Sequence, residues 1–317
     1  MDLSFLGLGK RKSTAKTAAG AKKVAGAKKP APKKTAGKKA PVQKPEEDLV
    51  EKAKVLLARG ERDQGMALCR EALAIKPRFN EAHKTMGHAL MPGTGYKELI
   101  KRIHETIKPE TYLEIGVLKG GALTLALEDT KTIGIDPQPK IEPEIPSKAR
   151  IYPTYSDTFF KRYNLFEEFG ADKLDLVFID GLHHYDQVLR DFINVEKYAS
   201  KQTVVLFHDV YPPTEISAQR ERVTKYWAGD TWKIIPCLKE TRPDLKIDVI
   251  PTYPCGLGVV TNLDNTSTHL RDNLKAFTDK YDALPFSKIE EDRERFLNAT
   301  ENSWENILKL IEPGIRA

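Results

Sequence analysis

The sequence predicts an α/β fold with a doubly wound, mostly parallel sheet of seven strands. Short apolar runs alternate with helical patterns between Tyr96 and Thr261, and this alternation is typical of parallel sheets, which need crossover helices. The last two runs are joined only by a short turn, so we expect an antiparallel hairpin at the edge of the sheet. Most of the preceding runs end on a polar residue.

A helix over residues 96–107 leads into the first strand. The runs that we assign to strands are 111–115, 131–135, 150–155, 174–179, 203–207, 246–251 and 256–261. We expect further helices over 122–127, directly after the Gly120-Gly121 pair, over 185–198, and over 289–311, where the pattern is amphipathic.

The basic residues are concentrated at the start of the chain. Residues 1–45 hold 13 of the 51 Lys and Arg residues but one of the 45 acids, so the remainder carries a net charge of −6. We expect a disordered tail there, because it has hardly any large apolar side chain. Its lysines, Lys10 to Lys44, are either a contact for nucleic acid or another polyanion, or a solubilising arm.

Residues 46–92 switch to a helical periodicity that resembles a tetratricopeptide repeat, with one full unit and the first helix of another. Such units need about three copies to be stable alone. The helices over 47–90 therefore have to pack on the next domain, as a cap or a peptide-binding groove, or on a partner chain such as a second copy. We place the α/β domain at 93–265 and a helical extension at 266–317.

The remaining sequence features favour a soluble, cytoplasmic protein. No apolar run approaches the roughly 18 residues of a membrane span, and residues 3–8 are too short for the core of a signal peptide. The three cysteines, Cys69, Cys237 and Cys255, fit neither a disulfide framework nor the spacing of a zinc site.

The turn after the first strand indicates the class of ligand. Glu114 ends the strand and Gly116 and Gly120 follow it, and a carboxylate at this place repels phosphate but attracts a cation or sugar hydroxyls. There is no GK[ST] signature of a nucleotide triphosphate site. Asp136, after the second strand, is placed for ribose hydroxyls, and Asp157, after the third, for the amine of adenine. A sulfonium nucleoside, S-adenosylmethionine, suits this arrangement.

Further polar residues follow the fourth and fifth strands. Asp180 follows the fourth, with His183 and His184 close behind, and His208-Asp209 follows the fifth. The carboxyl ends of parallel strands lie at one edge of a sheet. We therefore expect five carboxylates to converge in one crevice, namely those of Glu114, Asp136, Asp157, Asp180 and Asp209.

These motifs are similar to those of class I S-adenosylmethionine-dependent methyltransferases. Residues 96–262 resemble the branch with FIDGxHxY after the fourth strand, here residues 178–185, which includes bacterial O-methyltransferases. The resemblance implies a Rossmann-like methyltransferase fold. It also implies roles in cofactor binding: Glu114, Gly116 and Gly120 around the methionine part, Asp136 at the ribose and Asp157 at the adenine.

The resemblance also implies candidate catalytic residues, which are Asp180, His183, His208 and Asp209. In metal-dependent O-methyltransferases a divalent ion chelates the acceptor, and here Asp180, His208 and Asp209 are its expected ligands, for Mg²⁺ or Mn²⁺. His208 stands where that family prefers an oxygen ligand, and imidazole suits Mn²⁺ better than Mg²⁺. In the metal-free alternative, His208 or His183 is a general base.

A long insertion over residues 211–245 is expected to overhang the pocket. Its Trp227 and Trp232 either stack on an acceptor ring or anchor the insertion in the core. We expect methylation of an oxygen on a small-molecule or saccharide acceptor. The alternatives are a nucleic-acid or protein methyltransferase tethered by the basic tail, and a non-catalytic scaffold.

Overall fold

The computed structural model describes residues 44–315. The predicted basic tail, including its lysines up to residue 43, lies outside the described residues. Within the part of the chain that the structure describes, every helix is too short or too polar to cross a bilayer. The three cysteines are free and buried.

Seven strands form one sheet, in the order β3-β2-β1-β4-β5-β7-β6. Their bounds are β1 (Thr111–Ile115), β2 (Lys131–Ile135), β3 (Ala149–Tyr152), β4 (Leu176–Ile179), β5 (Val204–His208), β6 (Lys246–Ile250) and β7 (Leu257–Thr261). Strands β1 to β5 pair in parallel, and β7 runs antiparallel to both β5 and β6. The predicted fold class and edge hairpin are confirmed, and β7 lies between β5 and β6.

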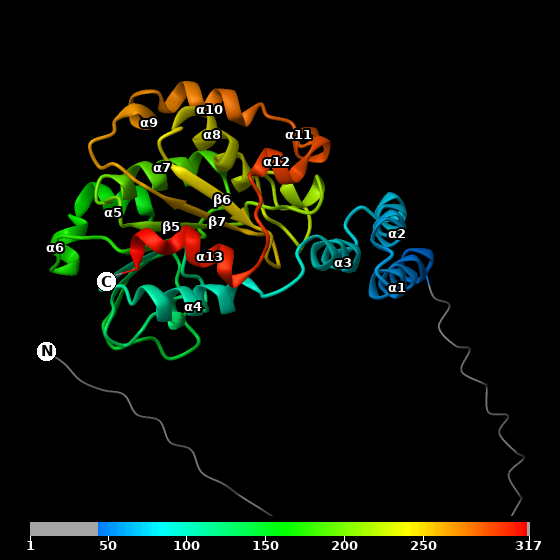
Figure 1. Ribbon diagram of the computed structural model, residues 1–317, viewed down its shortest axis with the longest axis horizontal. Helices are drawn as coiled ribbons and strands as arrows, with labels where there is room; N and C mark the ends of the chain where they lie inside the picture. The colour runs from blue at the N-terminus through cyan, green and yellow to red at the C-terminus, as the bar shows by residue number, and fades with distance from the viewer. Residues whose placement is uncertain (1–43, 316–317) are drawn as a thin grey trace, which may run out of the picture. The chain divides into compact units, whose positions relative to one another are not determined.

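Helices cover both faces of the sheet (Figure 1). Helices α4 (Tyr96–Ile107) and α13 (Trp304–Ile311) lie on one face, and α7 (Tyr185–Glu196), α8 (Ile234–Thr241) and α10 (Leu274–Asp282) lie on the other. Strand β4 shows the reason, because it is apolar on both sides: Leu176 and Phe178 pack with α4 and α13, whereas Val177 and Ile179 pack with α7. Fully apolar strands are typical of parallel sheets covered on both faces.

Shorter helices complete the α/β domain and the end of the chain. They are α5 (Ser156–Arg162), α6 (Leu165–Phe169), α9 (His269–Asp272), α11 (Ser287–Glu291) and α12 (Arg293–Leu297), with 3-10 turns at Leu123–Leu125, Ile216–Ala218, Thr231–Lys233 and Glu312–Gly314. The insertion that follows β5 thus contains two of these turns and α8.

The helix expected over residues 122–127 is wrong, because only the 3-10 turn Leu123–Leu125 forms there. Strand β2 begins at Lys131 beside the start of β1, so the chain after Gly121 has to return along the whole strand. A strand of five residues spans about 17 Å, and an α-helix rises only about 1.5 Å per residue. Ala126 leaves the 3-10 turn with an extended backbone, φ of −62° and ψ of 145°, and the chain turns at residues 128–130 into β2.

The continuous helix expected over residues 289–311 is also wrong, since α11, α12 and α13 are separate. Asn298 ends α12 in a left-handed conformation, with φ of 54°. The backbone there is diverted onto the edge strand: Val249 N–H donates to the Asn298 carbonyl (3.0 Å), and Thr300 N–H donates to the Val249 carbonyl (2.9 Å). Covering an exposed sheet edge satisfies its free backbone groups.

Three helices precede the α/β domain: α1 (Pro45–Ala58), α2 (Arg62–Ile75) and α3 (Asn80–Leu90). Helix α3 makes direct contacts with later segments. His83 Nδ1 lies 3.0 Å from Thr214 Oγ1, and the His88 ring stacks on Tyr253 with 3.7 Å between centroids. The helices therefore pack on the insertion and on the β6–β7 turn, while their likeness to a tetratricopeptide repeat stays a prediction.

Candidate functional site

Four of the predicted catalytic side chains meet at the carboxyl ends of β4 and β5. His208 Nδ1 lies 3.2 Å from Asp180 Oδ1 and 3.2 Å from Asp209 Oδ2. His183 Nδ1 lies 2.9 Å from Asp209 Oδ2, and its Nε2 lies 3.5 Å from Asp180 Oδ1. We call Asp180, His183, His208 and Asp209 the strand-end cluster.

The backbone of this cluster is strained. Both His183 (φ 60°) and Asp209 (φ 62°) adopt left-handed conformations that side-chain-bearing residues rarely take. Such outliers cost about 1–3 kcal/mol each and gather at functional sites, where surrounding contacts enforce them. The positions of the two side chains are therefore imposed by the fold around them.

The charges of the cluster depend on one another. Burial alone would lower the pKa values of His208 and His183, but the carboxylates of Asp209 and Asp180 raise both, that of His208 well above its usual value. Burial would likewise raise the pKa of Asp209, yet the two histidines hold it below its usual range. The cluster thus pairs two carboxylates with two bases that readily take up protons.

Glu114, at the end of β1, lies beside this cluster. It is 1% exposed, and the Tyr112 hydroxyl donates to its Oε2 (2.7 Å). Burial raises the pKa of Glu114 to about 8, with Asp180 adding to the rise while Tyr112 and Lys97 act against it. A nearby cation would reverse this shift by favouring the ionised carboxylate.

Gly116 is required by packing of the backbone. With φ of 93°, it lies so close to the end of β4 that a Cβ would stand 2.0 Å from the Asp180 carbonyl oxygen. Gly120 also has a positive φ, of 79°, and faces Ile141. The glycines thus bring the turn after β1 against the strand-end cluster, and their predicted contact with a cofactor stays a prediction.

Asp136 fixes the same turn. Its Oδ2 accepts the Leu118 N–H (2.8 Å) and its Oδ1 accepts the Gln138 N–H (2.7 Å). Each carboxylate oxygen can accept a second hydrogen bond, so Asp136 can hold ribose hydroxyls while it holds the turn.

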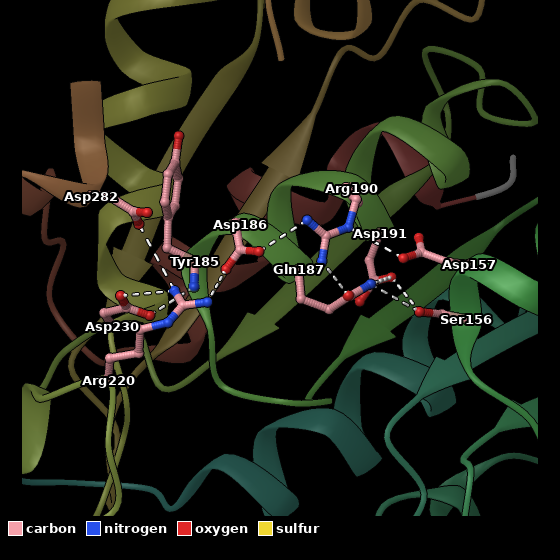
Figure 2. Close-up of polar contacts among 10 residues, drawn as sticks. All are labelled: Ser156, Asp157, Tyr185, Asp186, Gln187, Arg190, Asp191, Arg220, Asp230 and Asp282. Carbon is pink, nitrogen blue, oxygen red and sulfur yellow. Dashed lines mark hydrogen bonds and ion pairs between the residues drawn. The ribbon is translucent and has the colours of Figure 1, made fainter. Parts of the chain in front are cut away.

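Asp157 lies elsewhere in the polar network (Figure 2). It stands in the first turn of α5, and its Oδ2 lies 3.2 Å from Arg190 Nε on α7. Ser156, its neighbour, donates to the buried Asp191 (2.6 Å). The structure joins Asp157 to Arg190 and not to the strand-end cluster, and its role at an adenine ring stays a prediction.

Comparison with known proteins decides the family. A family model described as a methyltransferase domain matches residues 113–210, from β1 to the end of β5. An uncharacterized protein of Acanthamoeba polyphaga mimivirus is 31% identical over 172 residues, which cover 48% of this chain and 72% of that protein. The chain is a methyltransferase.

Solved methyltransferases are similar in fold. The O-methyltransferase TomG from Streptomyces achromogenes, solved with SAM, is 14% identical, with a TM-score of 0.39 over 56% of this chain and 87% of that chain. The SAH-bound methyltransferase PaMTH1 from Podospora anserina is 15% identical, with a TM-score of 0.42 over 72% of this chain and 100% of that chain.

The methyltransferase has one group of residues that suits a metal ion among those that the structure describes. Asp180, His183 and Asp209 each offer a ligand atom, and these atoms lie within 4.8 Å of one another. Two carboxylates and an imidazole fit a divalent ion such as Mn²⁺. The expected ligand set named His208 in place of His183, whereas the group whose ligand atoms lie together contains His183.

Sequence reasoning missed two side chains at this site of the methyltransferase. Tyr96, the first residue of α4, packs its ring on His208 with 4.3 Å between centroids. The thiol of Cys255 lies against Asp209, and its burial, together with that carboxylate, keeps the pKa of the thiol well above its usual value. Both lie outside the matched motifs, and the Gly95-Tyr96 helix start was the one available signal for Tyr96.

Exposed apolar residues mark the rim of the same edge. Leu118, Tyr155 and Leu182 follow β1, β3 and β4, and are 60%, 68% and 56% exposed. Two hollows of the described surface lie elsewhere, one of about 470 Å³ along β6 and one of about 770 Å³ between α3 and Tyr253, so we place the site by its polar groups and its turn.

Proposed function

We propose that this enzyme methylates a hydroxyl oxygen of a small-molecule or saccharide acceptor. The observation that carries the proposal is the strand-end cluster, in which two carboxylates and two imidazoles meet at the sheet edge next to Glu114. A hydroxyl is a weak nucleophile, and it gains most from a base at the reacting oxygen.

In the proposed reaction, the acceptor oxygen attacks the methyl carbon of the sulfonium. The new C–O bond forms as the C–S bond breaks, the sulfur leaves as a neutral thioether, and the hydroxyl proton passes to His183. Asp209, 2.9 Å from His183 Nδ1, stabilises the imidazolium that results. Orientation of the two reactants can supply about 7–11 kcal/mol of the barrier, and a base about 10²–10⁴ in rate.

We propose that the cofactor lies over the turn after β1. Glu114 then faces the sulfonium, Gly116 and Gly120 border the methionine part, Asp136 accepts the ribose hydroxyls, and Asp157 with the exposed Tyr155 lies toward the adenine. The burial of Glu114 supports this arrangement, because a cation offsets the cost of ionising a carboxyl group in an apolar setting.

A divalent ion fits Asp180, His183 and Asp209. When bound, such an ion lowers the pKa of an acceptor hydroxyl. The three side chains would hold it, and His208 Nδ1 would lie 3.2 Å from both carboxylates. Dialysis against a chelator followed by addition of Mn²⁺ or Mg²⁺ decides between the two forms of the site: loss and recovery of turnover support the ion, and full turnover after chelation supports the metal-free base.

The experiment for the proposed function combines cofactor binding with an acceptor screen. We expect S-adenosylhomocysteine to bind, and sugar and polyphenol acceptors to show methyl incorporation at oxygen. Asp180→Ala and His208→Ala should each lower turnover at least tenfold with cofactor affinity kept. Full turnover in both variants would remove the cluster from the chemistry.

The charge of residues 1–45 favours one second candidate, a methyltransferase acting on a polymer that the tail holds. The tail carries 13 basic residues and a single acid, and such segments bind polyanions in a salt-dependent way. Loss of polymer methylation on deletion of residues 1–43, with cofactor binding kept, would support this candidate.

A further inference from the structure

We infer that Trp227, Gly229 and Asp230 of the insertion form a clamp that holds His183 in its place in the strand-end cluster. These three are thus positioning residues for the methyl transfer, acting through His183. The inference rests on the role proposed for His183, and it assigns a function to an insertion that lies beyond the matched methyltransferase domain.

Each clamp residue touches a different part of His183. The Trp227 ring is parallel to the imidazole, with 4.9 Å between centroids and 4° between planes. Asp230 N–H donates to the His183 carbonyl oxygen at 3.2 Å. A Cβ on Gly229 would lie 2.0 Å from that oxygen, and Gly229 itself has φ of 63°, so only glycine permits this approach. The clamp thus contacts both the imidazole face and the backbone carbonyl of His183.

The clamp is anchored to α7 by charged contacts (Figure 2). Asp230 Oδ1 accepts the N–H of Tyr185, the first residue of α7, at 2.7 Å. Arg220 approaches Asp230 Oδ2 at 3.4 Å and pairs with Asp186 Oδ1 at 2.5 Å. Figure 2 shows Arg220, a residue of the insertion, reaching Asp186 on α7, so that it ties the clamp to the helix that begins two residues after His183.

These contacts explain why His183 keeps its left-handed backbone. A residue with a side chain leaves this conformation unless its surroundings enforce it. If the clamp were lost, the backbone would relax and the imidazole would move away from Asp209 Oδ2, now 2.9 Å from Nδ1. The reaction would then lose the group that takes the proton. The turn after β1, over which we propose that the cofactor lies, would be unaffected.

Trp227→Leu tests this inference directly. We expect kcat to fall at least tenfold, with the affinity for S-adenosylhomocysteine unchanged, and Trp227→Phe, which keeps a ring on the imidazole, to recover most of the loss. Arg222 lies over the Trp227 ring at 5.7 Å. Trp304→Leu is the matched control, because Trp304 likewise lies under an arginine, Arg102 at 4.0 Å, but belongs to α13. The control should keep wild-type kcat.

A double variant shows whether Trp227 acts through His183. Groups that act as one unit are not additive, so Trp227→Leu should cause no further loss of kcat once His183→Ala is present. An additional tenfold loss in that background, or an equal loss in Trp304→Leu, would overturn the inference.

A measurement without any acceptor separates this inference from the proposed function. A ring stacked on an indole is shielded, so the His183 ring protons should resonate upfield in NMR spectra of the full chain with S-adenosylhomocysteine bound, and Trp227→Leu should abolish that shift. If no hydroxyl acceptor is found, but the His183 protons are shifted upfield and Trp227→Leu abolishes the shift, the clamp is supported and the proposed acceptor class is wrong. His183 signals that are unshifted, or that Trp227→Leu leaves unchanged, would overturn the clamp.

Discussion

Single carboxyl groups at the sheet edge behave differently because their surroundings differ. Glu114 is fully buried and has its pKa raised to about 8, whereas Asp209, equally buried, has its pKa lowered because His208 and His183 outweigh the effect of burial. The first is ready to respond to a cation, and the second keeps its ionised form beside the two imidazoles. The residue types alone do not reveal this difference, since it arises from partners that the fold supplies.

Cofactor affinity should depend on pH through Glu114. Because the pKa of Glu114 is raised, its protonated form contributes to the stability of the fold. This contribution is fully present below pH 4.5 and is lost as the pH rises through about 8. The sulfonium favours the ionised form, so the affinity for S-adenosylmethionine should rise between pH 6 and 8, by at most about tenfold per unit, and then level off. Calorimetric titrations at several pH values measure this.

The product S-adenosylhomocysteine is the matched control, because it lacks the positive sulfur. Its affinity should change much less over the same range, and Glu114→Gln should flatten the curve of S-adenosylmethionine. Parallel curves for the two ligands in the wild-type protein would show that Glu114 does not sense the sulfonium.

Asp136→Ala should weaken the binding of S-adenosylhomocysteine at least tenfold. The loss combines the hydrogen bonds proposed for the ribose, each about 1.5–3 kcal/mol for a charged acceptor, with the hold on Leu118 and Gln138 in the turn. Asp136→Asn should lose less affinity, because its amide oxygen can still accept hydrogen bonds. Unchanged affinity in Asp136→Ala, measured by calorimetry, would place the ribose elsewhere.

At the scale of elements, α3 packs against the insertion at Tyr226. The Tyr226 hydroxyl donates to the Pro254 carbonyl, and a Cβ on Gly87 of α3 would lie 2.4 Å from the Tyr226 oxygen. Tyr226 precedes Trp227, which stacks on His183. Helix α3 therefore contacts Tyr226, and the next residue, Trp227, contacts His183 of the strand-end cluster. Through these contacts the N-terminal helices have a structural role in the enzyme.

Gly87→Val should accordingly lower turnover while the affinity for S-adenosylhomocysteine is kept. The added side chain would displace Tyr226, at a cost of about 1–3 kcal/mol typical of overpacking, and the melting temperature should fall slightly. Gly65→Ala in α2 is the control, because its Cβ would press on Leu57 of α1 and not on the insertion. An equal loss of turnover in both variants would mean general destabilisation.

Elements were predictable where local pattern decides them. The bounds of α4 and β2 were predicted to the residue, since Tyr96–Ile107 is amphipathic and Lys131–Ile135 contains three β-branched residues and ends directly before Asp136-Pro137. The missing helix after Gly121 was not predictable, because it depends on the distance back to β2. The break at Asn298 was not predictable either, because it depends on the edge of β6. Likewise the sequence brought Asp180, His183, His208 and Asp209 into one site, but the clamp on His183 depends on the folded insertion.

At the scale of the molecule, the chain joins an acidic body to a basic tail. The residues after 45 carry a net charge of −6. The cytoplasmic location, and a partner or second copy on the helices over 47–90, stay predictions.

Deletion of residues 1–43 should leave the turnover of a small acceptor unchanged, because the strand-end cluster and the turn after β1 are built from later residues. The same deletion should remove any salt-sensitive binding to a polyanion, measured by anisotropy with labelled nucleic acid at two salt concentrations. Loss of small-acceptor turnover would instead make the tail part of the active enzyme.

The most direct test of the whole account is a crystal structure of the protein with S-adenosylhomocysteine. We predict that the ribose lies on Asp136 and that the sulfur lies between Glu114 and the strand-end cluster, with room for an acceptor oxygen about 3 Å from the methyl position. A cofactor bound away from this edge, or one whose sulfur faces away from Asp180 and His183, would contradict the account.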